Sequence, residues 1–315
     1  MYLSSTQNHG MFQLMDRLAS STINTYSYKA KVADLNDALD WYCQNAFKAD
    51  GQWSFDDLNE TSPPIDTQSI VSGTNRYKVG SFTEKIFNLL KLEVLDSAGL
   101  GVELTPETLG SLPGTFQELY LNATSGVPTH YLKYGDFVYL RPNPNYSLAS
   151  ALKAYFNRTA TKFTFTTVTV NAGTDVFTST AHGLVAGDTV IFETDGTIPT
   201  GLTADATYYV ISGGLTADDF KVSTTLGGAA VDVTNAQTSS NHCFLKTSTQ
   251  AGIPEAHHIC LVRRAALNFL NYTTSSKLGT LPSLVARDEI IIGEYYGGRD
   301  KDLVKRLTPV SQNTR

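Results

Sequence analysis

The sequence is poor in cysteine, and its three thiols, Cys43, Cys243 and Cys260, lie far apart in no Cys-x-x-Cys spacing. Neither a disulfide framework nor a zinc site is therefore indicated, and we expect free, buried thiols. No apolar run approaches the roughly 20 residues that a helix needs to cross a bilayer. No basic leader precedes an apolar segment either, so we expect a soluble protein that is not exported.

Motifs that carry chemistry are also missing. The chain has no phosphate loop, no Gly-x-Ser-x-Gly, no His-Glu-x-x-His and no Gly-x-Gly-x-x-Gly. His257 and His258 are neighbours, which point about 100° apart on a helix and cannot share a metal ion. We interpret His182 as a turn residue and the acidic pairs at 56–57 and 218–219 as solvated turn residues. The sequence thus predicts a protein that is not an enzyme and holds no metal or cofactor.

A strongly basic surface is absent as well. Charged residues make up 17% of the chain, the formal net charge is −6, and no basic stripe with interleaved aromatic residues occurs. Tight nucleic-acid binding depends mostly on lysine and arginine that neutralise phosphates, so it is not indicated.

Helical periodicity is present at both ends of the chain. Apolar residues at alternating steps of four and three predict a helix over 25–48, with Tyr28, Val32, Leu35, Leu39, Tyr42 and Ala46 on its buried stripe. Residues 11–18 form a shorter amphipathic piece. Pro254 and Glu255 begin a third helix, which carries Ile259, Val262, Ala266 and Phe269. A fourth helix is predicted over 282–296, with a buried stripe of Leu284, Ile291 and Tyr295.

Strand patterns fill the region between residues 65 and 158. Segments 68–71 and 76–79 predict a hairpin, and 86–95 and 102–104 predict further strands. Thr105, Pro106 and Glu107 have the order of a helix start, with a helix around 113–121. Residues 126–158 then predict a three-stranded meander, because period-two alternation is interrupted by the turns 134–136 and 142–145.

Residues 164–247 have a different character. They are rich in Thr, Gly, Val and Ala, and short alternating segments at 168–170, 176–177, 190–192, 209–211, 220–222 and 231–233 predict a small β-sandwich or barrel. Eight acidic and two basic side chains place the whole formal charge of −6 in this segment. We interpret this segment as a module inserted into a loop of another domain.

Ten residues carry a resemblance to a known family: Gly126, Pro128, Tyr131, Gly135, Leu140, Pro142, Pro144, Tyr155, Pro254 and Glu255. With the order of the surrounding elements, they resemble the head-to-tail adaptor (neck) proteins of tailed bacteriophages, which form a ring beneath the portal protein. The resemblance covers 86–158 and 252–296, and more weakly 11–48. The run 181–212 resembles a β module that recurs within phage virion proteins.

The resemblance implies a non-enzymatic virion protein of the neck, assembled in the host cytoplasm. It implies twelve copies around the DNA channel, contacts with the portal protein and the next neck or tail protein, and genome DNA that passes without specific binding. The polar C-terminal tail, 301–315, has the composition of an ordinary frayed chain end. The resemblance implies instead that this tail is an arm that docks on the portal. The tail's apolar residues are then the candidate contacts: Leu303, Leu307, Pro309 and Val310.

The predicted fold class is α+β. An adaptor core, 1–163 and 248–315, combines helices with an antiparallel meander, and 164–247 forms an inserted all-β domain. An alternative function is a tail, collar or tail-tube component whose insertion decorates the neck or binds host glycan. Three aromatic residues are candidates for stacking on sugar: Tyr208, Tyr209 and Phe220. A hydrolase would need a catalytic constellation that the sequence does not contain.

Overall fold

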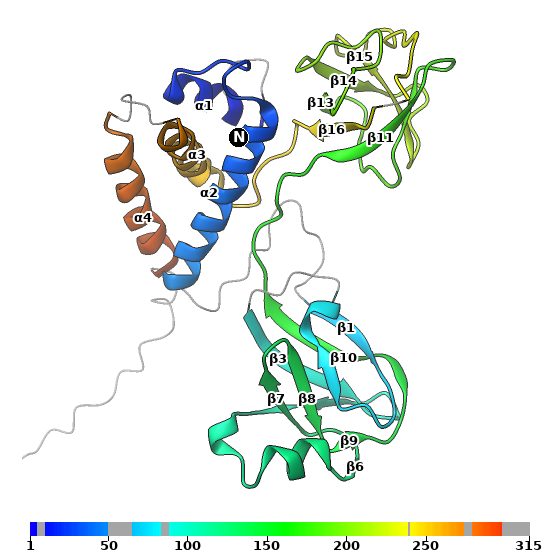
Figure 1. Ribbon diagram of the computed structural model, residues 1–315, viewed down its shortest axis with the longest axis vertical. Helices are drawn as coiled ribbons and strands as arrows, with labels where there is room; N and C mark the ends of the chain where they lie inside the picture. The colour runs from blue at the N-terminus through cyan, green and yellow to red at the C-terminus, as the bar shows by residue number, and fades with distance from the viewer. Residues whose placement is uncertain (5–9, 50–64, 83–87, 239, 274–278, 298–315) are drawn as a thin grey trace, which may run out of the picture. The chain divides into compact units, whose positions relative to one another are not determined.

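The computed structural model describes residues 1–4, 10–49, 65–82, 88–238, 240–273 and 279–297. The fold is α+β, and the chain divides into two compact units (Figure 1). One unit comprises Met1–Asp50 with Thr161–Arg315 and contains helices and a β-barrel; the other, Gly51–Ala160, is built from two sheets. The sequence-based division placed these sheets in one core with the helices. The structure differs because the sheets enclose a hydrophobic core of their own.

The helical part consists of α1 (Met11–Ala19), α2 (Tyr28–Ala49), α3 (His258–Tyr272) and α4 (Leu281–Gly297). The α3 helix packs against the other three. The stripe predicted for α2 is buried from Val32 to Ala46, whereas Tyr28 is half-buried. Among the described residues, no helix has both the length and the apolar character needed to cross a bilayer.

The stripe predicted for α4 is not the buried one. The residues that α4 buries lie one position further along the chain: Leu281, Val285, Asp288, Ile292 and Tyr296. Ile291 and Tyr295 remain 38% and 40% exposed. Both stripes have helical spacing and apolar residues, so periodicity could not choose between them. The packing of Leu281 and Val285 against α3 made the choice.

The inserted segment is a closed six-stranded barrel in the order β11-β12-β15-β14-β13-β16. Its strands are β11 (Thr166–Asn171), β12 (Val176–Thr178), β13 (Thr189–Thr194), β14 (Thr207–Ile211), β15 (Asp219–Ser223) and β16 (His242–Lys246). The first and last strands pair, with Thr166 opposite Phe244, so the two ends of the module lie close together. The predicted strand at 231–233 is wrong: Val233 is buried but belongs to no strand, and β16 takes the sixth place.

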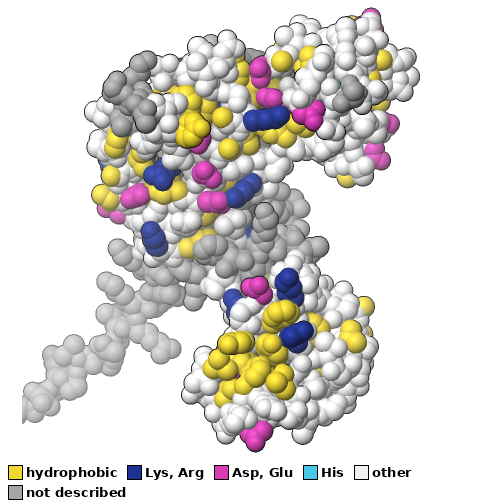
Figure 2. Space-filling model, viewed as in Figure 1, with side chains coloured by type: hydrophobic (Ala, Val, Ile, Leu, Met, Phe, Trp, Pro, Cys, Tyr) yellow, Lys and Arg dark blue, Asp and Glu magenta, His cyan; other side chains and the backbone are white. Residues whose placement is uncertain are grey.

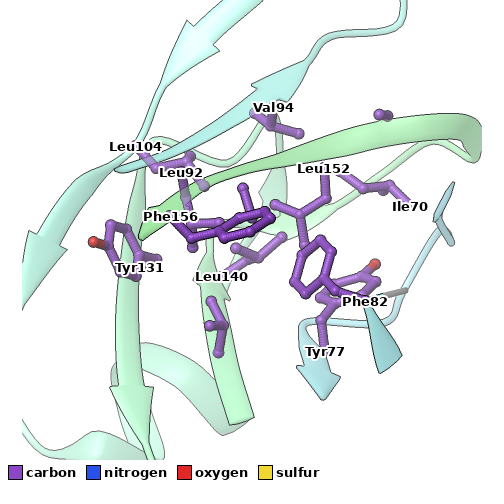
Figure 3. Close-up of a cluster of buried hydrophobic side chains, with 13 residues drawn as sticks. Ile70, Tyr77, Phe82, Leu92, Val94, Leu104, Tyr131, Leu140, Leu152 and Phe156 are labelled. Atoms are coloured by element: carbon purple, nitrogen blue, oxygen red, sulfur yellow. The ribbon is translucent and has the colours of Figure 1, made fainter. Parts of the chain in front are cut away.

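The second unit consists of two four-stranded sheets that pack face to face. One has the order β1-β10-β3-β4 and the other β2-β8-β7-β5. The strands of the first are β1 (Ile65–Ile70), β10 (Leu148–Asn157), β3 (Asn88–Leu95) and β4 (Gly101–Glu103), and those of the second are β2 (Arg76–Lys78), β8 (Phe137–Arg141), β7 (His130–Tyr134) and β5 (Thr105–Glu107). Both sheets contribute to one core, in which Leu152 and Phe156 of β10 lie near Leu140 of β8 (Figure 3). We call it the two-sheet unit.

The predicted three-stranded meander is wrong at its third strand. The strands β7 and β8 pair antiparallel as predicted, but β10 lies in the other sheet, between β1 and β3. The chain leaves the β2-β8-β7-β5 sheet at Pro142 and Pro144, which have no N–H to continue a ladder. A short pair, β6 (Ser125–Gly126) and β9 (Asn143–Pro144), forms at this crossing.

Two further local predictions are wrong in the same unit. Strands form near 68–71 and 76–79, but β1 pairs with β10 and β2 with β8, so they make no hairpin. Thr105, Pro106 and Glu107 begin no helix; they form the edge strand β5, where the missing N–H of a proline is tolerated. The helix predicted around 113–121 begins later, with a π-helical turn η3 over Gln117–Leu121.

Candidate interaction site

The family-motif residues of the two-sheet unit meet at the crossing between its sheets. Gly126 of β6 lies opposite Pro144 of β9. A Cβ atom placed on Gly126 would lie 3.6 Å from Cβ of Pro142, so both prolines lie next to Gly126. Tyr131 lies opposite Leu140 in the β7–β8 register, and both side chains are buried. These five residues thus shape the path of the chain between the two sheets.

The remaining motif residues lie elsewhere. Pro128 is buried between β6 and β7, and Gly135 has φ +59° in the β7–β8 turn, a conformation that favours glycine. Tyr155 of β10 donates a hydrogen bond to Oε2 of Glu93 at 2.8 Å, and this bond is the main reason why the pKa of Tyr155 is raised. Pro254 precedes η4 (Glu255–His257), which leads into α3 of the other unit.

A cluster of five aromatic rings covers the outer side of the β2-β8-β7-β5 sheet. We call it the aromatic face: Phe116, Tyr120, Tyr134, Phe137 and Tyr139. The ring of Phe116 lies 5.5 Å from Tyr120, 5.1 Å from Tyr139 and 6.2 Å from Tyr134, measured between ring centres. Tyr120 is fully buried, whereas Tyr134 is 55% exposed. Figure 2 shows hydrophobic side chains gathered over β7 and β8.

Strand alternation places these rings outward. In β8, Val138 and Leu140 point into the core, so Phe137 and Tyr139 point to the other side of the sheet. Arg76 of the neighbouring strand lies with its guanidinium 4.7 Å from the ring of Phe137, in a cation–π contact. The aromatic face therefore has a basic border.

A polar network fixes the segment that packs on the aromatic face. Arg141 Nη2 donates to Oε1 of Glu107 at 2.5 Å, and the Tyr120 hydroxyl donates to the other oxygen of the same carboxylate. Burial, together with this hydrogen bond, raises the pKa of Tyr120. Asn75 donates to the backbone oxygen of Tyr120. Because one carboxylate ties η3 to β8, the exposed rings are held on a rigid base.

A polar cavity of about 260 Å³ adjoins this network. It is lined in part by Glu118, Asn122, Thr124, His130, Arg141 and Pro142. A second cavity, of about 390 Å³, lies at the barrel and is lined in part by Gly187, Val210, Ser212 and Leu226. Neither gathers the side chains of a recognisable catalytic constellation.

The predicted glycan-stacking residues are not on the barrel surface. Phe220 is fully buried and Tyr208 is 2% exposed, and both belong to the barrel core. Tyr209 is only partly exposed. The prediction of a three-ring platform is therefore wrong for two of its members, because β14 and β15 turn those rings inward.

The histidines and the acidic pair at 218–219 have structural partners. Nδ1 of His257 lies 2.5 Å from the Tyr42 hydroxyl, and Nε2 of His258 lies 3.1 Å from two backbone carbonyl oxygens. Burial lowers the pKa of both rings. His182 accepts a hydrogen bond within its turn, from the N–H of Leu184. Asp218 and Asp219 accept bonds from the chain around 178–181.

In the part of the chain that the structure describes, no three His, Cys, Asp or Glu residues are grouped so that they could hold a metal ion. The acidic pair at 56–57 lies outside the described residues. So do the predicted tail contacts Leu303, Leu307, Pro309 and Val310.

The aromatic face was not among the sites predicted from the sequence. Its signal was present, since Phe116, Tyr120, Tyr134, Phe137 and Tyr139 fall within one short region and three of them alternate around the β7–β8 turn. The Glu107–Arg141 pair had no local signal, because 34 residues separate its members. Compared with known proteins, the chain matches no protein-family model and no curated protein.

Proposed function

We propose that this chain is a structural virion protein that joins the head of a tailed bacteriophage to its tail, as a ring of copies beneath the portal protein. The observation that carries the proposal is the meeting of Gly126, Pro142 and Pro144 at one crossing. These residues are among those by which the sequence resembles the adaptor family. Since they meet in space, the resemblance describes one local structure rather than scattered identities.

The aromatic face supports an assembly role. Contiguous apolar surface on a soluble protein usually marks a contact with another molecule. Tyrosine and arginine are enriched at the centres of protein interfaces, where a large ring or a guanidinium fills a pocket of the partner. Tyr134 and Arg76 are both exposed on this face. We assign it to the portal protein, which is the first neighbour of an adaptor ring.

In the proposed ring, twelve copies surround the DNA channel and the next neck or tail protein binds the opposite side. Each copy meets two neighbours through different surfaces, because a closed ring of this kind uses heterologous contacts. The genome passes through without specific binding, and the acidic barrel is carried as an additional module.

The test uses the full-length chain, alone and mixed with the portal protein of the same virus. In the mixture, native mass spectrometry and electron microscopy should show a closed ring of this chain bound to the portal. A chain that stays monomeric at every concentration and ignores the portal would overturn the proposal.

A matched pair of variants tests the assigned surface. Tyr134→Ser removes the most exposed ring of the aromatic face, and we expect about a tenfold loss of portal affinity, as for an interface hot spot. Leu100→Ser changes a side chain that is 67% exposed beside β4 in the same unit, and should leave the affinity unchanged. Equal losses of portal affinity in both variants would show that the aromatic face is not part of the contact.

A further inference from the structure

The α4 helix has a second apolar side, which faces solvent. Ile290 is 61% exposed and Ile291 38% exposed, although α4 already buries another stripe against α2 and α3. Figure 1 shows α4 along the outer side of the helical bundle. A helix that is apolar on two sides has more hydrophobic surface than its own bundle covers, which indicates a further partner.

Charged residues on the same side show which partner fits. Arg287 and Glu294 are both exposed and seven residues apart, which is two turns or about 10.5 Å along the axis. Ile290 and Ile291 lie at the midpoint between them. The side therefore carries a positive charge, two isoleucines and a negative charge in a symmetric order.

We propose that α4 is a self-association surface on which two copies of this chain pack their α4 helices antiparallel. With the two-fold axis between Ile290 and Ile291, Arg287 of each copy lies opposite Glu294 of the other. Ile290 then packs on Ile291. A parallel pair would place Arg287 against Arg287 and Glu294 against Glu294, so the charges select the antiparallel order. Antiparallel helices also oppose their dipoles favourably.

This contact goes beyond the adaptor role and does not depend on it. A single pair of helices is small beside a standard interface of about 1,600 Å², so the dimer is weak and reversible. A two-fold contact pairs two copies and cannot by itself continue around a ring. The dimer is thus a state of the free protein, in which the isoleucines of both copies are covered.

Charge reversal tests the pairing. Sedimentation equilibrium of the full-length chain without portal protein, over a wide concentration range, should show a monomer–dimer equilibrium. Arg287→Glu or Glu294→Arg alone places like charges opposite each other at both ends, and should weaken the dimer by about tenfold or more. The double variant restores two opposite-charge pairs and should return the dissociation constant to near the wild-type value.

Each outcome decides the proposal. A wild-type chain without dimers, or a double variant as weak as the single ones, overturns the antiparallel pairing. Because all of these side chains are exposed, circular dichroism should be unchanged in every variant, and the rescue excludes a simple folding defect. Ile291→Ser should also weaken the dimer, whereas Leu100→Ser, in the other unit, should not.

Discussion

The barrel and the two-sheet unit are both built from short strands, but they treat their aromatic residues in opposite ways. The barrel closes on itself and turns Phe177, Phe192 and Phe220 inward, with 4.8 Å between the rings of Phe177 and Phe192. The two-sheet unit keeps open edges and carries Tyr134 and Phe137 on an outer side. A closed barrel has no strand edge left to pair, whereas open sheets present both edges and faces to partners.

The comparison shows where interaction surface can be found in this chain. The barrel holds most of its aromatic surface inside, and burying this surface away from water already stabilises the fold. The two-sheet unit leaves part of its aromatic surface outside, where it stays in contact with water and contributes less to stability. The following substitutions test this difference, from the largest expected effect to the smallest.

Phe220→Ala should be the most damaging change. The ring is fully buried, and its centre lies 5.3 Å from that of Phe244 and 5.5 Å from that of Phe177. Removing the ring leaves a cavity, which should lower the free energy of unfolding by about 3–5 kcal/mol. Phe137→Ala on the aromatic face, where the ring is only partly buried, should cost clearly less. Urea unfolding followed by peptide-resolved hydrogen exchange measures both, and equal losses would contradict the comparison.

Gly201→Ala should damage the barrel by about 3 kcal/mol, through backbone strain and a steric clash. Gly201 has φ +105°, and a Cβ atom there would lie 2.0 Å from the backbone oxygen of Asp232. Gly73→Ala in the two-sheet unit is the control, since φ is +78° but the space around it is open. It should cost only about 1 kcal/mol. Thermal unfolding of the two variants measures the loss of unfolding free energy in each. Similar losses would show that the barrel loop moves to accommodate the added methyl group.

Arg141→Met should destabilise the two-sheet unit by about 1–3 kcal/mol, because Glu107 is only 12% exposed and loses its charged partner. Tyr120→Phe keeps the ring and removes one hydrogen bond, so its effect should be about 1 kcal/mol. Hydrogen exchange should rise in η3 and β8 but not in the barrel. Protection that falls in the barrel instead would contradict the assignment of this network to the two-sheet unit.

The smallest effects should be opposite responses to pH. Burial, followed by the nearby Asp205, raises the pKa of Glu193 in the barrel above its ordinary 4.5. The protonated carboxyl group stabilises the folded state, and this contribution to the free energy of unfolding is lost as the pH rises from 4.5 through the raised pKa. Hydrogen bonds from Lys91 and Tyr155 lower the pKa of Glu93 in the two-sheet unit. Its contribution is present above 4.5 and is lost as the pH falls through the lowered pKa.

The two isosteric variants separate these responses. Relative to wild type, Glu193→Gln should stabilise the barrel increasingly as the pH rises above about 4.5, and Glu93→Gln should destabilise the two-sheet unit at neutral pH but not in acid. Unfolding free energies measured as a function of pH check both signs. Curves that shift in the same direction would contradict the stated causes of the two pKa shifts.

Much of the fold could be predicted from local pattern. The strands at 168–170 and 190–192 and the helix over 25–48 form where alternation and helical spacing place them. The turn at Gly135 also forms, because a left-handed residue is needed there. Each of these features depends on neighbours within a few residues.

The wrong predictions share one physical cause: each depended on which of several segments, distant in the sequence, an element packs against. The alternation of Leu148 to Phe156 fits β10 in either sheet, and only the shared core decides that it lies between β1 and β3. Likewise Phe220 alternates in the same way whether it faces a sugar or the barrel interior. The candidate site was only half predicted for this reason: its motif residues were visible, whereas its aromatic face depends on which side of the sheet became the core.

By itself the sequence determined which side chains share a face of a strand or helix, where turns interrupt these elements, and that the net negative charge falls in residues 164–247. The tertiary structure decided which sheet β10 joins, which stripe of α4 is buried, and which rings remain outside. The physical reason is that the periodicity of side chains along a strand or helix is a local property of the backbone. Which face is buried depends on the rest of the fold, because the buried face is the one whose packing removes most apolar surface from water.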